Sequence, residues 1–189
     1  MKFNDTTSPM AKVLHAAAFA AQRHSDQRRK GKRAAPYINH PIAVSACLAD
    51  VGVEDADILA AALLHDTVED TNTSLAELEE LFGQRVASIV AEVTDDKSLP
   101  KAERKLRQIA SAPTKSHEAK LVKLADKICN LQDLRDCPPD WNEDRINAYH
   151  RFARDVYCGL RGTHSALDGQ MDHLLGQHVQ AGDKLCTFD

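Results

Sequence analysis

The amino-acid sequence predicts an all-α protein, a compact bundle of about eight to ten helices. Apolar residues recur every three to four positions in most segments, and prolines or glycines separate these segments. No segment alternates apolar and polar residues convincingly, as a half-buried strand does. The length of 189 residues, with 43% hydrophobic residues, suits one globular domain with a full core. We expect a flexible arm over residues 1–9, one domain over 10–180 and a tail over 181–189.

The expected helices follow from helical spacing and from residues that begin or end helices. Pro41 suits the first turn of a helix, where its missing N–H costs little. Ser74 and Glu77 form a capping box that begins a short helix, and Gly83 ends that helix. Pro100 begins a basic helix. We therefore expect helices at about residues 11–24, 41–51, 58–70, 74–83, 84–93, 100–113, 117–135, 143–160 and 165–179.

The composition argues against several classes of protein. The formal net charge of −4 does not suit general nucleic-acid binding, which needs a basic surface. No apolar run approaches the length of a membrane span, and the N-terminus lacks a signal-peptide hydrophobic region. The five cysteines contain no Cys-x-x-Cys pair and predict neither a zinc knuckle nor a disulfide framework. We expect a cytoplasmic monomer or small homo-oligomer, without a nucleic-acid or membrane partner.

The stretch that carries the clearest chemical signal lies near the middle of the chain. Residues 58–64 are apolar without a break, and a helix that is apolar on all sides is buried. The same helix is expected to carry four ionisable residues on stripes that continue its buried faces, namely His65, Asp66, Glu69 and Asp70. An isolated carboxylate in such a place costs several kcal/mol or takes up a proton. A bound cation explains the cluster, and the alternative is a frayed helix end in solvent.

Three further features have both a functional and a structural interpretation. The loop 27–36 holds five Arg or Lys residues, which suit a phosphate or a purine base but are also typical of a solvated loop. His40 stands where a helix begins, as a metal ligand or as a cap or core residue. Asp126 stands at the border of a buried helix face, as a metal ligand or as the partner of Lys123 or Lys127.

Two histidines and two carboxylates on three expected helices form a mixed nitrogen and oxygen donor set. They are His40, His65, Asp66 and Asp126. Such a set, with water in its open positions, suits Mn²⁺, Fe²⁺ or Zn²⁺ in a catalytic role. The order His … His-Asp … Asp along an all-helical chain resembles the HD superfamily of metal-dependent phosphohydrolases.

Four motifs resemble more closely the hydrolase domain of the RelA/SpoT family. They are YINHP at 37–41, ALLHDTVEDT at 62–71, VTDDK at 93–97 and KLVKLADK at 120–127. The resemblance covers about residues 11–165 and implies an HD-domain helical bundle. The chain leaves no room for a synthetase or regulatory domain, so it is most similar to the stand-alone small alarmone hydrolases of the metazoan SpoT homologue type.

The resemblance implies a reaction and its machinery. The reaction is hydrolysis of guanosine tetra- and pentaphosphate, (p)ppGpp, at the ribose 3′-diphosphate, which yields GDP or GTP and pyrophosphate and degrades the alarmone of the stringent response. The implied metal is Mn²⁺, with Zn²⁺ or Fe²⁺ as alternatives, held by His40, His65, Asp66 and Asp126. Glu69 and Asp70 then orient or deprotonate the attacking water without binding the metal.

The same resemblance implies the substrate contacts. They are Arg29 and Lys30 for the guanine and phosphates, Asn130 for the ribose or 3′-phosphate region, Tyr149 for the pocket wall, and Lys97 and Arg104 for further phosphate contacts. The sequence departs from the family pattern at residues 31–35, directly after the basic pair. The base contacts therefore rest on the least similar part of the chain.

Three other functions remain as alternatives. NADPH is a second substrate candidate, because its 2′-phosphate also stands on a purine ribose. A general HD nucleotidase would leave the basic loop and the pair Glu69 and Asp70 without a purpose. A non-catalytic alarmone sensor would be expected to lack a metal ligand or one of the acidic pair, and all six positions are occupied here.

Overall fold

The computed structural model describes residues 8–31 and 33–177, and within these ranges the fold is all-α. Its helices are α1 (Pro9–Arg23), α2 (Asn39–Asp50), α3 (Ala56–Leu64), α4 (Thr67–Asp70), α5 (Leu75–Phe82), α6 (Gln84–Val93), α7 (Lys101–Ser111), the 3-10 helix η1 (Ala112–Thr114), α8 (His117–Asp136), α9 (Glu143–Leu160) and α10 (Ser165–Gly176). Among the described residues, β pairing is limited to one isolated bridge between Arg28 and Pro36. The predicted fold class is confirmed.

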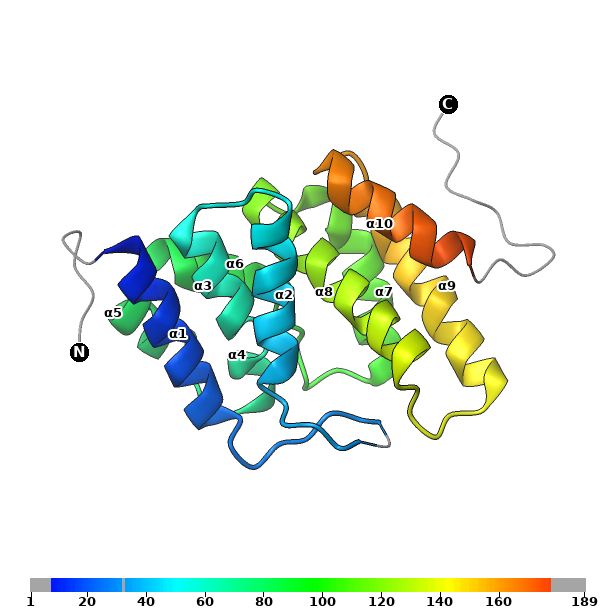
Figure 1. The fold of residues 1–189 in the computed structure, drawn as a ribbon, viewed down its shortest axis with the longest axis horizontal. Helices are drawn as coiled ribbons and strands as arrows, with labels where there is room; N and C mark the ends of the chain where they lie inside the picture. The colour runs from blue at the N-terminus through cyan, green and yellow to red at the C-terminus, as the bar shows by residue number, and fades with distance from the viewer. Residues whose placement is uncertain (1–7, 32, 178–189) are drawn as a thin grey trace.

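Helices α3 and α8 form the centre of the bundle. Helix α3 packs against α1, α2, α6 and α8, and three successive alanines, Ala60, Ala61 and Ala62, are fully buried in it. Helix α8 packs against α2, α6, α9 and α10, and more than half of its residues are buried. Figure 1 shows α1, α3 and α5 on one side of the molecule, α9 and α10 on the other, and α2 and α8 between them. Residues on α2, α3 and α8 can therefore meet inside the bundle.

The expected helix ends are confirmed where a capping residue marks them. The hydroxyl of Ser74 accepts a hydrogen bond of 3.1 Å from the backbone N–H of Glu77, and α5 begins at the next residue. Gly83 ends α5 at a φ of 94°, a conformation that favours glycine. At the N-terminus, the Ser8 hydroxyl caps α1, which therefore begins at Pro9, inside the arm expected over residues 1–9.

The central helix differs from its prediction. The sequence predicts one helix over 58–70, but α3 ends at Leu64 and α4 begins at Thr67. The side chain of Thr67 donates to the carbonyl of Leu64 at 2.7 Å, and His65 Nδ1 bonds to the carbonyl of Ala62 at 2.8 Å. These side chains bind carbonyls at the end of α3 that a continuous helix would use itself. His65 and Asp66 therefore lie at a break between two helices.

Other expectations fall partly outside the described residues or need correction. Residues 1–7 of the expected arm and the tail over 181–189 lie outside the described ranges, as does Val179 at the expected end of the last helix. Cys158 is disulfide-bonded, which the cysteine spacing did not predict. Within residues 8–31 and 33–177, no helix combines the length and apolar character needed to cross a bilayer. The cytoplasmic location stays a prediction.

Candidate metal centre and adjoining pocket

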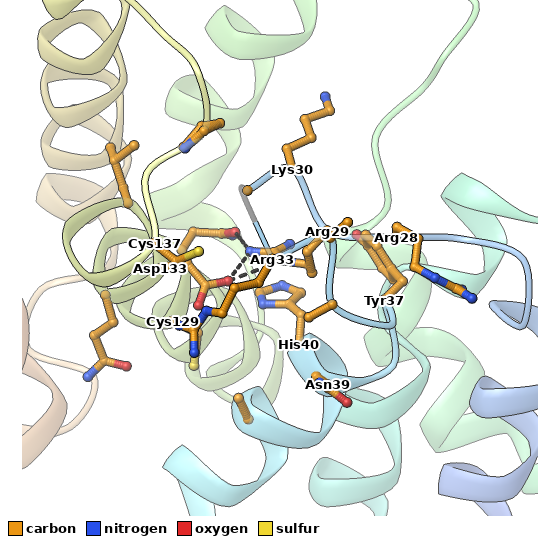
Figure 2. Close-up of a pocket in the computed structure, with 18 of the residues that line it drawn as sticks. Arg28, Arg29, Lys30, Arg33, Tyr37, Asn39, His40, Cys129, Asp133 and Cys137 are labelled. Atoms are coloured by element: carbon orange, nitrogen blue, oxygen red, sulfur yellow. Dashed lines mark hydrogen bonds and ion pairs between the residues drawn. The ribbon is translucent and has the colours of Figure 1, made fainter.

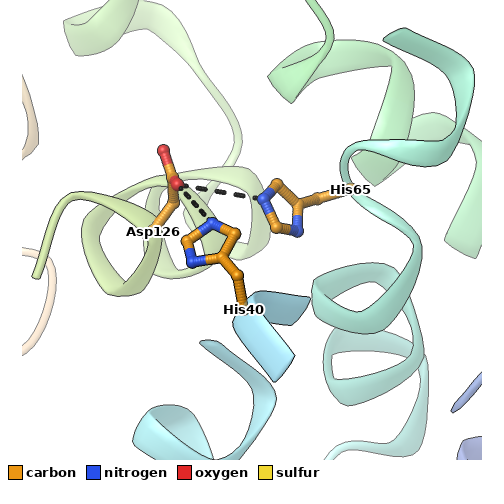
Figure 3. Close-up of side chains that lie close together, drawn as sticks. All are labelled: His40, His65 and Asp126. Carbon is orange, nitrogen blue, oxygen red and sulfur yellow. Dashed lines mark hydrogen bonds and ion pairs between the residues drawn. The ribbon is translucent and has the colours of Figure 1, made fainter. Parts of the chain in front are cut away.

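Three elements bring His40, His65 and Asp126 together inside the bundle. They come from the first turn of α2, the break after α3 and the middle of α8, and all three are buried (Figure 3). Their ligand atoms lie within 4.8 Å of one another. Asp126 Oδ1 is 3.2 Å from His40 Nε2 and 3.8 Å from His65 Nε2. His40 therefore turns into the core from the first turn of its helix.

Both imidazoles direct Nε2 at the cluster, and in His65 this nitrogen has no hydrogen-bond partner in the described part of the protein. His65 Nδ1 donates to the carbonyl of Ala62, which leaves Nε2 directed at the cluster. His65 Nε2 is buried and has no hydrogen-bond partner. A buried nitrogen without a partner is costly, and a metal ion removes that cost. The donor set thus fits a divalent cation that accepts nitrogen and oxygen ligands.

Asp66 adds a second carboxylate to the centre. Its Oδ2 lies 3.1 Å from His65 Nε2 and 4.0 Å from His40 Nε2, and it accepts a hydrogen bond of 2.6 Å from the hydroxyl of Tyr37. Burial opposes ionisation of Asp66, but the imidazoles of His65 and His40 outweigh burial and hold the pKa of its carboxyl well below the usual range. Asp66 is therefore an anion, as a metal ligand must be.

Asp126 pairs with Lys127, one of the two partners that its sequence position allowed, and also belongs to the buried cluster. Its Oδ2 lies 3.3 Å from the ammonium of Lys127, and its Oδ1 accepts a bond of 2.5 Å from the amide of Asn130. Lys123, the other candidate partner, donates instead to the carbonyl of Val93 at 3.1 Å. Burial opposes ionisation here too, but Lys127 and His40 hold the pKa of Asp126 far below its usual value. The ion pair orients the carboxylate without removing it from the cluster.

The acidic pair Glu69 and Asp70 lies on α4, directly after Asp66. Burial and the neighbouring Asp95 raise the pKa of Glu69, so this carboxylate accepts a proton more readily than an exposed one. Glu69 lies 3.7 Å from Arg104, and Asp70 forms an ion pair with Lys97. Lys97 and Arg104 therefore contact the acidic pair, and neither belongs to the wall of the large cavity described next.

A cavity of about 720 Å³ adjoins the centre, and both His40 and Asp70 belong to its wall. The basic loop forms one side of this cavity, with Arg28, Arg29, Lys30 and Arg33 along it (Figure 2). Asn130 and Tyr149, two further predicted contacts, also line it. Its volume suits one small-molecule ligand, and its four cations suit an anionic one.

Arg29 is held in place by residues of α8. Its guanidinium donates to Asp133 Oδ2 at 2.6 Å and to Asn130 Oδ1 at 2.8 Å. It also lies 5.7 Å from the centre of the Tyr37 ring. Asp133 has no role in the sequence prediction, although it follows Asp126 by seven residues, two helical turns along the same face. That spacing could have identified it.

An aromatic wall of the cavity includes a second residue that the sequence reasoning missed. The ring centres of Trp141 and Tyr149 are 6.2 Å apart, and the guanidinium of Arg145 lies 4.2 Å from the Trp141 ring. Aromatic faces of this kind suit a planar ring of a ligand. Trp141 is the single tryptophan of the sequence and follows a Pro-Pro pair, but neither fact places it at a cavity.

Comparison with known proteins identifies relatives over most of the chain. An HD-domain family profile matches residues 16–164. The Xenopus tropicalis protein named guanosine-3′,5′-bis(diphosphate) 3′-pyrophosphohydrolase MESH1 is 54% identical over 170 residues, which cover 89% of this chain and 95% of the relative. The Homo sapiens protein of the same name is 52% identical over 172 residues, which cover 90% and 96%.

A solved structure gives the same result for the fold. It is described as a metazoan ortholog of SpoT that hydrolyzes ppGpp and plays a role in starvation responses. It matches with a TM-score of 0.87 and 45% sequence identity, over 91% of this chain and 98% of the other. The chain therefore belongs to the HD-domain family, among the MESH1-type relatives of SpoT.

Proposed function

We propose that this protein is a metal-dependent guanosine 3′,5′-bis(diphosphate) 3′-pyrophosphohydrolase. The observation that carries the proposal is the buried cluster of His40, His65 and Asp126 beside a cavity lined by four cations. The near-full-length relatives whose names state this activity support it. The cavity then takes a guanine nucleotide that carries a diphosphate at the ribose 3′ position.

The proposed metal ligands are His40, His65, Asp66 and Asp126. We propose Mn²⁺ as the ion, with Zn²⁺ or Fe²⁺ as alternatives that the same donors accept. A divalent ion held by these residues would polarise a phosphoryl oxygen and would make a water molecule easier to deprotonate. Ion pairs and hydrogen bonds from Lys127, Asn130 and Tyr37 hold the two carboxylates in place before the ion binds.

The acidic pair acts on the attacking water. Glu69 takes a proton from this water, because burial raises the pKa of its carboxyl and makes it a better base. Asp70, which borders the cavity, orients the same water. The oxygen of the water bonds to the phosphorus nearest the ribose, and the bond from that phosphorus to the 3′ oxygen breaks. The 3′ oxygen takes up a proton, which leaves GDP and pyrophosphate.

The cavity residues bind the remainder of the substrate. We assign the guanine and the phosphates to Arg29 and Lys30, since guanidinium and ammonium groups pair with phosphoryl oxygens and a guanidinium stacks on a purine. Asn130 forms hydrogen bonds with both Arg29 and Asp126, so it lies between the proposed guanine-binding residue and the metal centre. We place the ribose beside Asn130. We propose that Tyr149 packs against the bound nucleotide and that Trp141, which contacts Tyr149, lines the cavity next to it.

Turnover by metal-stripped protein tests the proposal. Guanosine 3′,5′-bis(diphosphate) is incubated with the stripped protein, alone and with Mn²⁺, Zn²⁺ or Mg²⁺, and the products are separated by ion-exchange chromatography. We expect GDP and pyrophosphate only when a metal is present. The Asp66→Asn variant should bind the metal much more weakly and lose the activity. Asp172→Asn, which alters a carboxylate paired with Arg161 away from the centre, should keep both.

The same experiment separates the alternatives. Orthophosphate released from NADPH, without turnover of the tetraphosphate, would assign the site to a phosphatase. Tight binding of the tetraphosphate without turnover under any metal would make the protein a sensor. Size-exclusion chromatography with light scattering measures the oligomeric state, for which we propose a monomer or a small homo-oligomer.

A further inference from the structure

Tyr37 occupies the boundary between the metal centre and the cavity, and the sequence reasoning gave it no chemical role. It follows the basic loop and precedes α2, and its backbone N–H donates to the carbonyl of Gln27 at 3.0 Å. Its ring packs at 4.8 Å from the His24 ring and at 6.2 Å from the His40 ring, measured between centres. Backbone and ring are thus both held, so the direction of the hydroxyl is fixed.

The Tyr37 hydroxyl contacts both kinds of acidic residue in the site. It donates to Asp66 Oδ2 at 2.6 Å and lies 3.3 Å from Asp70 Oδ2. A phenol has one hydrogen to donate, and the shorter distance places it on Asp66. Asp66 Oδ2 is also the oxygen that lies 3.1 Å from His65 Nε2. The hydrogen bond therefore acts on the carboxylate oxygen that faces the metal centre.

We propose that Tyr37 is a positioning residue, whose hydroxyl holds the Asp66 carboxylate toward the metal centre. The inference rests on the proposed function, because it assumes a metal held by Asp66. A carboxylate that is already oriented binds the ion without first losing rotational freedom.

A further set of contacts supports this role. His24, which packs against the Tyr37 ring, is connected to Asp70 through Gln27. His24 Nδ1 bonds to Gln27 Oε1 at 2.8 Å, and the amide of Gln27 donates to the backbone carbonyl of Asp70 at 2.6 Å.

The ring of Tyr37 also lies beside a residue proposed to bind the substrate. Arg29, which we assign to the guanine and phosphates, lies 5.7 Å from the ring centre. Removing only the hydroxyl leaves this face of the ring unchanged. The change should therefore affect the metal and the chemical step more than the affinity for the substrate.

The test compares Tyr37→Phe with Tyr157→Phe. Tyr157 is a matched control, because its hydroxyl also donates to a carboxylate oxygen, that of Asp172 at 3.1 Å, away from the centre. Mn²⁺ affinity is measured on metal-stripped protein by the electron paramagnetic resonance of the unbound ion. We expect Tyr37→Phe to weaken Mn²⁺ binding by about 10- to 100-fold. Tyr157→Phe should match the wild type.

Kinetics and a double variant give two further readouts. At saturating Mn²⁺, Tyr37→Phe should lower kcat and change KM little. In an Asp66→Asn background, Tyr37→Phe should weaken the residual Mn²⁺ affinity no further, because the hydroxyl acts through Asp66. The double variant keeps the test valid if Tyr37→Phe also reduces thermal stability.

The outcomes distinguish this inference from the proposed function. Wild-type protein that binds no Mn²⁺ contradicts the metal centre, and the role of Tyr37 with it. Wild-type protein that binds Mn²⁺ and turns over substrate, with a Tyr37→Phe variant of equal affinity and kcat, contradicts the inference alone. Independent, additive effects of Tyr37→Phe and Asp66→Asn on Mn²⁺ affinity also overturn it.

Discussion

Each predicted metal ligand except His40 makes a second contact that fixes its orientation. His65 is held by the carbonyl of Ala62, Asp66 by Tyr37, and Asp126 by Lys127 and Asn130. These contacts leave the donor atoms of the centre close together and without full compensation from the protein. A cation bound among these atoms would offset the repulsion between the two carboxylates and accept the free lone pair of His65 Nε2.

The first prediction concerns the proton that the metal-free centre holds. Burial alone would lower the pKa of His65, but Asp66 and Asp126 outweigh burial and raise it to about 9. Because this value exceeds the usual pKa of about 6.5, protonation of His65 stabilises the metal-free fold. The stabilisation is complete below about pH 6.5 and is lost as the pH rises through about 9. Mn²⁺ displaces this proton, so its affinity should rise over the same window.

Urea unfolding in the presence of a chelator measures this effect. Between about pH 6.5 and pH 9, the free energy of unfolding of the wild type should fall relative to that of His65→Gln. Groups far from His65 titrate equally in both proteins, so they do not contribute to the difference between the two free energies of unfolding. Parallel stability curves for the two proteins would show that His65 carries no extra proton.

The second prediction separates Glu69 from the metal ligands. Glu69→Gln should keep the metal content of the purified protein, because Glu69 acts on the water and not on the ion. It should lower kcat by about 10²- to 10⁴-fold, the usual contribution of a general base. Elemental analysis beside steady-state kinetics measures both quantities. A variant purified without metal would show that Glu69 is a ligand and that the assigned roles are wrong.

At the scale of the element, helix ends were predictable where one residue determines them. Ser74 and Gly83 act locally, through a side-chain cap and a positive φ, so the sequence is enough to place them. The break between α3 and α4 was not predictable from apolar periodicity, because the stretch reads as a continuous helix. It depends on side-chain bonds from His65 and Thr67 to carbonyls one turn earlier.

The third prediction concerns the packing of α9 against η1. A Cβ added at Gly159 would lie 2.8 Å from Ala112 Cβ and 2.8 Å from Pro113 Cδ, closer than side chains pack. Gly159→Ala should therefore lower the free energy of unfolding by about 1–3 kcal/mol. Gly169 in α10 is the control, since a Cβ there meets nothing within 4 Å. Gly169→Ala should raise stability by about 0.5–1 kcal/mol, and equal effects of both changes would contradict the packing.

At the scale of the whole molecule, the bundle joins segments that are far apart in sequence. The basic loop reaches α8 through the pair of Arg29 with Asp133 and Asn130, and this contact closes one side of the cavity. The motifs were enough to predict that His40, His65 and Asp126 lie together, and the structure shows this cluster. The contacts of Tyr37, Asp133 and Trp141 depend on tertiary packing, which periodicity does not report.

The fourth prediction tests the closure of the cavity by this loop. The side chain of Asp133 is 55% exposed, so its ion pair with Arg29 is screened and contributes little. Asp133→Asn should raise KM by about two- to fivefold, with kcat nearly unchanged. Asp136→Asn is the control, because Asp136 pairs with Arg135 and does not line the cavity. A fall in kcat at unchanged KM would mean that Asp133 acts on the chemical step.

We propose that a metal centre formed by residues of α2, α8 and the break between α3 and α4 releases pyrophosphate from a guanine nucleotide. The most direct measurement is turnover of guanosine 3′,5′-bis(diphosphate) by metal-stripped protein in isotopically labelled water, before and after addition of Mn²⁺. We predict no turnover before addition and, after it, GDP without label and pyrophosphate that carries the labelled oxygen. Turnover that continues without metal, or label recovered in GDP, would contradict the account.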